Sequence, residues 1–298
     1  MTQRGPERVL VTGAAGRVGR GVLKVLAERG IAANALDLRD PGDLPADLVV
    51  IGDARDPVVV RASLREADAV VHLAAIPAPI GHPPELVYSL NTQSTFTVLE
   101  QAGRAGIRQV CLASSFALTG IPFGRDLHPA YVPVDEDLPT QSEDPYALSK
   151  QTDELTAWMM ARRHGMSVVA LRLPLVRGFD ELRADFVDTW SVNPKEGASA
   201  LWAYLETLDA ARACVLALSV PGPGAHAVYV AAPEILAPYP IVDLIRRFHP
   251  RAVIRRPLPG RVVPIDVSAA WELLGFAAER VIPMNERPAT WLSSGTDR

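Results

Sequence analysis

Three residues with side chains suited to proton transfer stand out in the sequence: Ser115, Tyr146 and Lys150. The i, i+4 spacing of Tyr146 and Lys150 places both on one face of a helix, one turn apart. A phenol is a poor base at neutral pH, and an ammonium group beside it favours the ionised form that accepts a proton. Ser115 directly follows an apolar run, where its hydroxyl could hold a substrate oxygen against the phenol. The pattern predicts proton transfer to or from a substrate hydroxyl.

The alternative is that Tyr146 and Lys150 fall four residues apart by coincidence. Lysine is scarce in this chain, because Lys24, Lys150 and Lys195 are the only lysines among 30 basic residues. A lysine at this position therefore stands against an arginine-rich composition, which favours the catalytic interpretation.

A glycine-rich turn near the N-terminus predicts a second kind of chemistry. Gly13, Gly16 and Gly19 lie between an apolar run at 9–11 and a segment with helical periodicity, in the order strand, turn, helix. Such glycines let a phosphate approach the backbone at a helix N-terminus, where free N–H groups and the helix dipole favour an anion. The combination predicts a nucleotide site, and a helix-entry loop without a ligand is the alternative.

An acidic residue strengthens the nucleotide interpretation. Asp37 ends the next apolar segment, eighteen residues after Gly19 (37 − 19), where a carboxylate could accept hydrogen bonds from an adenosine ribose. The same carboxylate would repel a 2′-phosphate, so NAD is expected to bind more tightly than NADP. Arg17 and Arg39 could soften that preference by pairing with the phosphate.

Apolar runs that alternate with helical periodicity position these residues. Strands are expected at 9–11, 48–51, 69–75, 109–113 and 167–171, with another ending at Asp37. Helices are expected from the glycine-rich turn to Arg29, at 84–105 and at 145–164, and later segments include a short strand at 228–230 and a short helix at 240–248. Near-continuous apolar strands separated by helices indicate a parallel sheet covered on both faces. The ligand crevice of such a fold lies at the carboxyl ends of the strands, where each motif falls.

We therefore expect an α/β fold, a doubly wound parallel sheet of the Rossmann type with a small C-terminal substrate lobe. Residues 1–172 are expected to form the dinucleotide-binding domain. Residues 173–298 are expected to form the smaller lobe, partly interleaved with the sheet.

Composition limits the remaining classes of function. A net charge of −4 over 298 residues gives no electrostatic footprint for nucleic acid or an anionic membrane surface. No apolar stretch is long enough to span a membrane, and the N-terminal segment leaves no room for a signal peptide. Cys111 and Cys214 have no metal-binding spacing, and buried free thiols indicate a reducing, cytoplasmic location. No metal is expected.

These motifs together resemble those of the extended short-chain dehydrogenase/reductases, the NAD-dependent epimerase/dehydratase group, over nearly the whole chain. The glycine-rich turn resembles the first fingerprint of that group, and Ser115, Tyr146 and Lys150 resemble its catalytic triad. Further landmarks are similar: Asp53-Ala54, Leu73-Ala74-Ala75, Asn91, the segment 208–213, Asp266-Val267-Ser268 and Leu274-Gly275-Phe276.

The resemblance implies a reaction and a set of site residues. The triad would move a proton on or off a substrate hydroxyl while a hydride passes to or from the nicotinamide of NAD, with Lys150 also holding the ribose hydroxyls. The substrate-binding residues would be Ala75, Ser115, Tyr146 and Arg177. The residues that bind NAD would be Gly13, Ala15, Gly16, Arg17, Val18, Gly19, Asp37, Leu38, Asp53, Ala54, Leu73, Ala74, Ala75, Asn91, Ser114, Tyr146, Lys150 and Pro174.

Two departures from the group bear on the substrate. Thr119 stands where an auxiliary tyrosine of some epimerases is found. Only 35 residues (209 − 174) separate Pro174 from Asp209, fewer than in nucleotide-sugar epimerases and more similar to uronate dehydrogenases. The segment 173–176 is nevertheless apolar where uronate dehydrogenases use small polar residues. Arg177 and Arg183 are the nearby candidates for holding a carboxylate.

The expected function is that of an NAD-dependent oxidoreductase acting on a secondary alcohol or ketone of a small polar substrate, with a sugar as one candidate. A nucleotide-sugar epimerase or reductase is the alternative among enzymes, and a regulator that senses nicotinamide cofactors is the alternative from another class. The resemblance also implies a homodimer. Its interface would use the helix after residue 84 and the helix of Tyr146, with apolar contact from Val98, Leu99, Trp158 and Met159.

Overall fold

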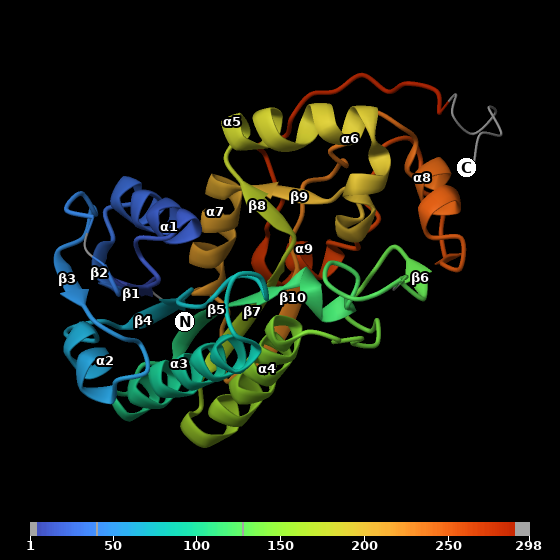
Figure 1. The fold of residues 1–298 in the computed structure, drawn as a ribbon. Coiled ribbons are helices and arrows are strands. Elements are labelled where there is room, and N and C mark those ends of the chain that lie inside the picture. The colour runs from blue at the N-terminus through green and yellow to red at the C-terminus, as the bar shows by residue number, and fades with distance from the viewer. Residues whose placement is uncertain (1–4, 40, 127, 290–298) are drawn as a thin grey trace.

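The computed structural model describes residues 5–39, 41–126 and 128–289, so the first four residues of the N-terminal segment considered above lie outside it. Its centre is a seven-stranded parallel sheet with the order β10-β7-β5-β4-β1-β2-β3 (Figure 1). The strands are β1 (Arg8–Thr12), β2 (Ala32–Asp37), β3 (Leu48–Ile51), β4 (Ala69–His72), β5 (Gln109–Ser115), β7 (Ser167–Leu173) and β10 (Gly224–Tyr229). The doubly wound parallel sheet expected from the sequence is confirmed.

The strand order reverses beside β1, which is the feature that creates a ligand crevice. The chain runs from β1 to β2 and β3 on one side, then crosses to β4 on the other side. The loops after β1 and β4 therefore diverge at the carboxyl edge of the sheet, and a crevice forms between them. β1 and β4 are buried throughout apart from Arg8, as expected of strands covered on both faces.

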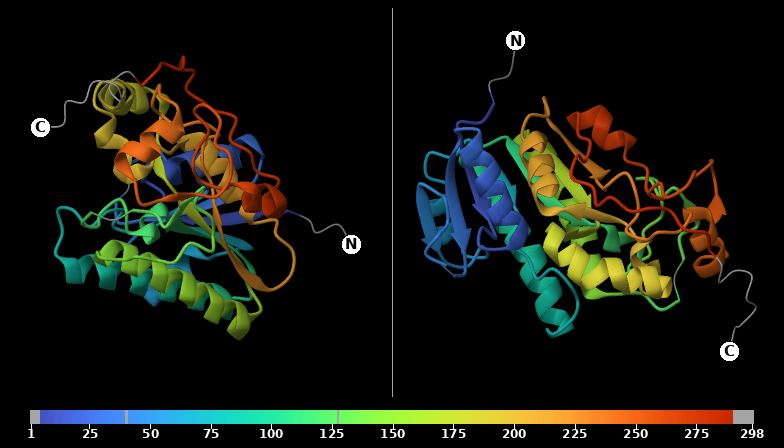
Figure 2. Two further views of the ribbon diagram at one scale, coloured as in Figure 1. Left: turned by 90° about the vertical axis from the view of Figure 1, so that its right-hand side faces the viewer. Right: turned by 90° about the horizontal axis from the view of Figure 1, so that it is seen from above.

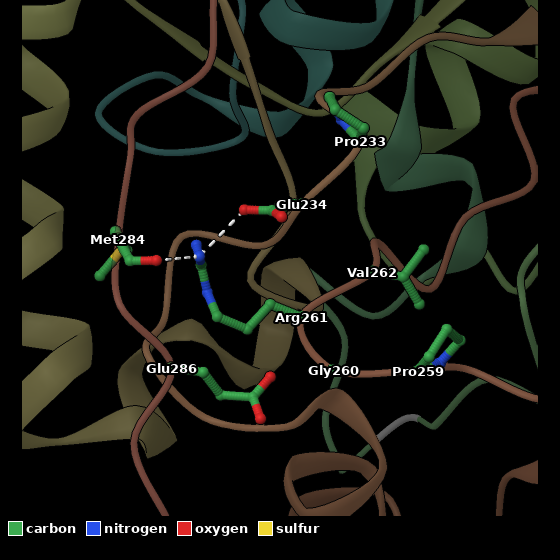
Figure 3. Close-up of a pocket in the computed structure, with 8 residues that line it drawn as sticks. All are labelled: Pro233, Glu234, Pro259, Gly260, Arg261, Val262, Met284 and Glu286. Atoms are coloured by element: carbon green, nitrogen blue, oxygen red, sulfur yellow. Dashed lines mark hydrogen bonds and ion pairs between the residues drawn. The ribbon is translucent and has the colours of Figure 1, made fainter.

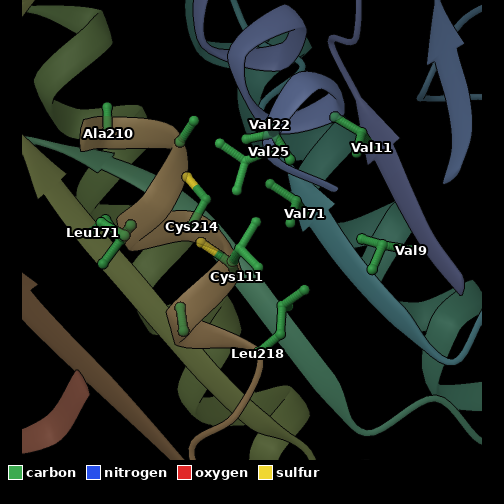
Figure 4. Packing of buried hydrophobic residues seen from close by; sticks show 14 of the residues in the cluster. Val9, Val11, Val22, Val25, Val71, Cys111, Leu171, Ala210, Cys214 and Leu218 are labelled. Atoms are coloured by element: carbon green, nitrogen blue, oxygen red, sulfur yellow. The ribbon is translucent and has the colours of Figure 1, made fainter. Parts of the chain in front are cut away.

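Helices cover both faces of the sheet. On one face, α1 (Arg17–Glu28) packs against α7 (Thr207–Ala217), and α9 (Ser268–Leu274) lies beside them. Figure 4 shows part of this core, where Cys111 of β5 and Cys214 of α7 lie close together among valines and leucines. Burial, and then the neighbouring Cys214, raise the pKa of the Cys111 thiol well above its usual value, which keeps the thiol protonated.

The other face is covered by α2 (Pro57–Ser63), α3 (Pro84–Arg104) and α4 (Pro145–His164). The longer two, α3 and α4, pack along each other (Figure 1). Gly103 allows their close approach, because a Cβ at this position would collide with the ring of His164. No helix in the described part of the chain has the length and apolar character needed to cross a membrane.

The C-terminal lobe lies on the α1 and α7 side of the sheet, opposite α3 and α4 (Figure 2). Its elements are β6 (Tyr131–Val132), β8 (Leu175–Arg177), β9 (Tyr204–Glu206), β11 (Val253–Ile254), α5 (Phe179–Leu182), α6 (Asp188–Val192), α8 (Ile241–Phe248), a π-helical turn (Arg183–Val187) and 3-10 turns at Phe116–Thr119 and Pro194–Ala200. A separate apolar cluster that includes Trp190, Trp202 and Tyr204 forms its core. β6 and the turn at Phe116–Thr119 precede residue 173, whereas the other elements of the lobe follow it, as do α7 and β10 of the central layers.

The structure differs from the sequence predictions in four local features. The strand expected at 69–75 ends at His72, and the following residues form a loop. The helix α2 was not expected, and the strand expected at 228–230 is the end of β10 in the main sheet. Val98 and Leu99, expected at a dimer interface, are fully buried, because the helical period turns them toward the sheet.

Candidate active site

A cavity of about 720 Å³ collects most of the residues predicted from the sequence to bind cofactor or substrate. Those that line it are Gly13, Ala15, Gly16, Arg17, Val18, Gly19, Asp37, Leu38, Asp53, Ala54, Leu73, Ala74, Ala75, Ser114, Ser115, Tyr146, Lys150, Pro174 and Arg177. Residues 13–19, 36–39 and 52–54 form what we call the glycine end. Residues 76–78, 116–117, 122–123 and 173–175, around Ser115 and Tyr146, form the tyrosine end.

The glycine end is shaped by backbone packed too closely for side chains. Gly13 has φ +66°, and a Cβ on it would lie 2.8 Å from the backbone nitrogen of Ala74. A Cβ on Gly19 would collide with the carbonyl oxygen of Gly13. The first turn of α1 begins directly afterwards at Arg17. Bare backbone at a helix N-terminus is the arrangement that accommodates a phosphate group.

Two carboxylates mark the ends of β2 and β3 at the glycine end. Asp37 Oδ2 accepts a hydrogen bond from the backbone N–H of Ala15 at 2.9 Å, which ties the carboxylate to the glycine-rich turn. Asp53 is engaged differently, because its two oxygens accept from the guanidinium of Arg55. The side-chain hydrogen bond from Arg55 lowers the pKa of the Asp53 carboxyl. Asp37 is therefore the carboxylate with hydrogen-bonding capacity left for a ribose.

The tyrosine end brings Ser115 and Tyr146 to one wall. Ser115 ends β5, and its Oγ accepts from the backbone N–H of Ala117 at 3.0 Å, which caps the following 3-10 turn. Tyr146 lies in the first turn of α4, whose start is fixed by Asp144 accepting from the N–H of Ala147. Both side chains are largely buried, with 9% and 8% of Ser115 and Tyr146 exposed. The rings of Phe123 and Tyr146 pack edge to face, with their centroids 6.0 Å apart.

Lys150 lies beneath Tyr146 on the same helix face. Its ammonium is 5.9 Å from the centroid of the Tyr146 ring. Lys150 Nζ donates to the carbonyl oxygen of Ala113 at 3.0 Å and to Asp153 Oδ2 at 3.2 Å. Asp153 is fully buried, and burial raises the pKa of its carboxyl while the charge of Lys150 opposes that rise. Two partners thus hold the ammonium in place and leave its third N–H free to serve a ligand.

A buried histidine lies behind this pair. His72 Nδ1 is 2.7 Å from Thr12 Oγ1, and its Nε2 is 3.2 Å from Thr95 Oγ1. Burial, and then the charge of Lys150, lower the pKa of His72 to about 3. The imidazole is therefore neutral at physiological pH. Thr12 Oγ1 also accepts from the N–H groups of Leu73 and Ala74, so the histidine helps to hold the loop that passes under the cavity.

A second network fixes the end of β5. Ser114 Oγ donates to Glu154 Oε1 at 2.5 Å, and Arg172 of β7 binds both oxygens of the same carboxylate. Glu154 was not singled out from the sequence. The signal that could have found it is the helical spacing, because Tyr146, Lys150 and Glu154 recur every four residues on one face of α4.

Asn91, predicted to bind the cofactor, does not line the cavity. It is fully buried, its Nδ2 donates to the carbonyl oxygen of Ile76 and to Ser149 Oγ, and its Oδ1 accepts from the N–H of Ile76. The amide therefore joins the loop after β4 to α4. In the structure its role is to hold the wall of the cavity in position.

One ion pair joins the glycine-rich turn to the lobe. Arg17 binds Glu181 of α5 through two contacts, Nη2 to Oε1 at 2.6 Å and Nε to Oε2 at 3.1 Å. The side-chain hydrogen bond from Arg17 lowers the pKa of Glu181 to about 2. Nearby, Arg177 Nη1 donates to the carbonyl oxygen of Val176, and the guanidinium lies 6.0 Å from the ring centroid of Phe186.

A second cavity, of about 510 Å³, lies in the lobe and contains none of the predicted site residues (Figure 3). Its wall is built around Arg261, which donates to Glu234 and to the backbone carbonyl oxygens of Ile235, Ala237 and Met284. The guanidinium thus holds the loop segments 234–237 and 284 of the lobe together. Within the described ranges, no three His, Cys, Asp or Glu side chains are grouped so as to hold a metal ion.

Comparison of the sequence with those of known proteins identifies the family of the chain. The profile of the NAD dependent epimerase/dehydratase family matches residues 9–232. A UDP-glucose 4-epimerase of Corynebacterium glutamicum is 27% identical over 290 residues, which cover 86% of this chain and 83% of that protein. A UDP-glucose 4-epimerase of Azospirillum brasilense is 34% identical over 182 residues, covering 58% of this chain and only half of that protein's length.

A solved structure shows the same fold. A short-chain dehydrogenase/reductase superfamily protein from Agrobacterium tumefaciens, crystallised with bound NAD, superposes with a TM-score of 0.69 at 23% identity and covers 92% of this chain and 93% of its own. The match over residues 9–232 also confirms NAD as the cofactor expected from the sequence. The chain therefore belongs to the NAD-dependent epimerase/dehydratase family.

Proposed function

We propose that the protein is an NAD-dependent oxidoreductase that interconverts a secondary alcohol and a ketone. The observation that carries this proposal is the meeting of Ser115, Tyr146 and Lys150 at one end of a cavity whose other end is a bare glycine-rich turn beside Asp37. The glycine end fits the diphosphate and the adenosine ribose of NAD, because its backbone leaves no room for a Cβ and Asp37 offers an acceptor.

The roles of the residues follow from their contacts. When bound, NAD supplies the acceptor or the donor of the hydride. Tyr146 takes the proton from the substrate hydroxyl in oxidation and returns it in reduction. Lys150, held by Ala113 and Asp153, stabilises the negative charge that develops on the phenol oxygen. Ser115 holds the substrate oxygen at the tyrosine end, where both hydroxyls line the same cavity.

Substrate screening by nicotinamide absorbance, with NAD and with NADH, tests the proposal. An oxidoreductase changes the absorbance in proportion to product, and a Tyr146→Phe variant that still binds NAD loses the signal. A nucleotide-sugar epimerase, the alternative that the curated relatives favour, restores its NAD in every turnover. It would convert UDP-glucose, followed by chromatography, without a lasting absorbance change. A cofactor-sensing regulator would bind NAD and turn over no substrate.

We also propose that two copies of the chain associate through α3 and α4. Large apolar side chains remain exposed there, including Phe96 (48%), Leu155 (64%) and Trp158 (48%). A second copy related by a two-fold axis would cover them with the same surface. The proposed location is the cytoplasm, which suits the two buried free thiols.

Light scattering at micromolar concentration tests the association, with a dimer mass expected for the parent protein. Trp158→Glu should give a monomer, because it replaces an exposed apolar side chain of this surface with a charge. Trp271→Glu is the matched control, since Trp271 is also exposed (62%) but belongs to α9 on the opposite side of the sheet. A monomer mass for the parent protein would contradict the proposal.

A further inference from the structure

The walls of the tyrosine end are apolar. Ile76 and Pro77 come from the loop after β4, Phe116 from the turn after β5, Phe123 from the loop that follows, and Leu175 from β8. None of the lining residues of this end defined above carries a polar side chain. The polar side chains of the cavity outside the glycine end are those of the triad together with Ser94, Ser114 and Arg177. A substrate that reaches Tyr146 must therefore lie against hydrocarbon on several sides.

The backbone of this end adds few hydrogen-bond donors. Three of its lining residues, Pro77, Pro122 and Pro174, have no backbone N–H. Among the neighbouring hydroxyls, Ser94 Oγ already donates within the protein, to the carbonyl oxygens of Asn91 and Ala74. Thr119 is buried and donates to the carbonyl oxygen of Phe116. The prolines and the engaged hydroxyls thus reduce the number of hydrogen-bond donors that a polyhydroxylated substrate would find around the reacting oxygen.

Arg177, the charged residue predicted to bind substrate, lies in a different environment. It follows Val176, donates to the carbonyl oxygen of that residue and stands over Phe186. The next residue, Gly178, donates its N–H to Glu181, which in turn binds Arg17 of the glycine-rich turn. The contacts of Arg177 therefore connect it to the wall shared with the glycine end.

The aromatic rings at the tyrosine end are held in position. Phe123 packs edge to face with Tyr146, and Phe116 does the same with Tyr229 at a centroid distance of 6.2 Å. Fixed rings beside the reacting phenol favour a flat or ring-shaped apolar group, which can stack or pack edge-on without losing hydrogen bonds. By contrast, every sugar hydroxyl left unpaired in such a site weakens binding by about tenfold or more.

From these observations we propose that the substrate is a secondary alcohol or ketone whose reacting carbon is attached to an apolar ring, such as an aryl ketone or a cyclic aliphatic ketone. This inference rests on the proposed oxidoreductase function and replaces the small polar substrate expected from the sequence. The reaction balances as in the proposed function: the carbonyl carbon gains a hydride from NADH, and its oxygen gains a proton from Tyr146.

Steady-state turnover with NADH and two pairs of probes tests the substrate class. Acetophenone and cyclohexanone represent apolar rings, and glucuronate (assayed with NAD) and UDP-glucose represent the polar class. The expected result is a kcat/KM for at least one apolar probe that exceeds the values for both sugars by about 100-fold or more, in keeping with several unpaired hydroxyls. Higher kcat/KM for a sugar would overturn the substrate class and leave the oxidoreductase function standing.

A matched pair of variants adds a site-specific measurement. Leu175→Asn introduces an amide at the tyrosine end and should lower kcat/KM for the preferred apolar probe about tenfold or more, with an unchanged Kd for NAD. Leu44→Asn is the control, because Leu44 is also partly buried but lies outside the cavity lining. Equal effects of the two variants would contradict a role of the tyrosine end in recognising the substrate.

Calorimetric binding to the NAD-loaded protein separates the two proposals. If acetophenone or cyclohexanone binds, and Leu175→Asn weakens that binding, but no probe is turned over, then the substrate class stands and the oxidoreductase function fails. If the sugars bind more tightly than the apolar probes, the substrate class fails. If none of the probes binds, the substrate class fails, and the substrate screen described under the proposed function still decides the oxidoreductase activity.

Discussion

The two ends of the cavity are formed by different parts of the chain: mainly backbone at the glycine end and mainly side chains at the tyrosine end. The glycine end is formed by backbone and by a carboxylate at the end of β2, whereas the tyrosine end is formed by apolar side chains from four separate loops and strands. A backbone site needs glycines at fixed spacing, which leave a motif in the sequence. A side-chain site needs only hydrophobic residues of suitable shape, which leave none. This contrast explains why the cofactor can be assigned from the sequence more readily than the substrate.

The largest expected effect comes from the catalytic residues of the tyrosine end. Tyr146→Phe and Lys150→Arg should each lower kcat by at least about 100-fold, the usual scale of general acid–base catalysis. The guanidinium is larger and planar, so it cannot take the place of the ammonium between Ala113 and Asp153. NAD titration should show that Tyr146→Phe retains cofactor binding.

The double variant should lose much less than the product of the single losses, because residues acting as a unit are non-additive. Turnover of Lys150→Arg within a few-fold of the parent would mean that Tyr146 and Lys150 are not a catalytic pair. The tyrosine end would then have no assigned catalytic role.

The next largest effect is expected at the glycine end alone. Gly19→Ala should weaken NAD binding at least about tenfold, because the added methyl group collides with the carbonyl oxygen of Gly13 and displaces the turn. Gly21→Ala lies in the same helix and meets only ordinary to tight contacts, at 3.2 Å from the Cβ of Ala211, so it serves as the control. Fluorescence titration with NADH measures both, and thermal melts report whether each variant folds. Parent-like affinity in Gly19→Ala would show that the turn does not contact the cofactor.

A smaller effect concerns the choice between cofactors. The parent protein should bind NAD(H) more tightly than NADP(H), and Asp37→Ser should reduce that ratio about tenfold by removing the repulsion of a 2′-phosphate. Arg39 also lines the glycine end, where its guanidinium can pair with the phosphate. Asp53→Asn is the control, since Arg55 already occupies that carboxylate. Calorimetric titration with both cofactors measures this ratio of affinities. Equal affinities in the parent would contradict the assignment of Asp37.

The smallest effect is expected for the ion pair between the glycine-rich turn and α5. Both side chains are about 40% exposed, so Glu181→Gln should cost less than about 1 kcal/mol of unfolding free energy. The folded-state pKa of Glu181 is lowered to about 2 from 4.5, so its stabilisation is present above pH 4.5 and lost as the pH falls toward 2. Urea titrations at neutral pH and at pH 3 should therefore show a smaller difference between parent and variant at pH 3 than at neutral pH. A larger difference at pH 3 would contradict the ion pair.

The parts of the molecule that could be predicted from the sequence depend on local patterns. The parallel sheet was predicted from apolar runs between helical segments, and Gly13 and Tyr146 were predicted as site residues from motifs. The helix α2 was missed because Val58, Val59 and Val60 are β-branched, while Asp56 and the proline after it set the helix start.

Other features depend on the tertiary structure. Asn91 could not be placed from the sequence, because its partners, Ile76 and Ser149, are distant in the chain. The apolar character of the tyrosine end emerged only when four segments met in space. The contact of Lys150 with Asp153 follows from helical spacing, but its burial depends on how α4 packs against β5.

The position of β10 has a consequence for how the chain acquires its structure during synthesis. β10 pairs with β7 through residues 224–229, after the chain has passed through most of the lobe. Until those residues leave the ribosome, β7 is an open edge whose residues 168–171 are apolar and are buried in the finished protein. Unpaired apolar edges recruit other chains, so a fragment cut at residue 172 should aggregate instead of folding as an independent nucleotide-binding unit.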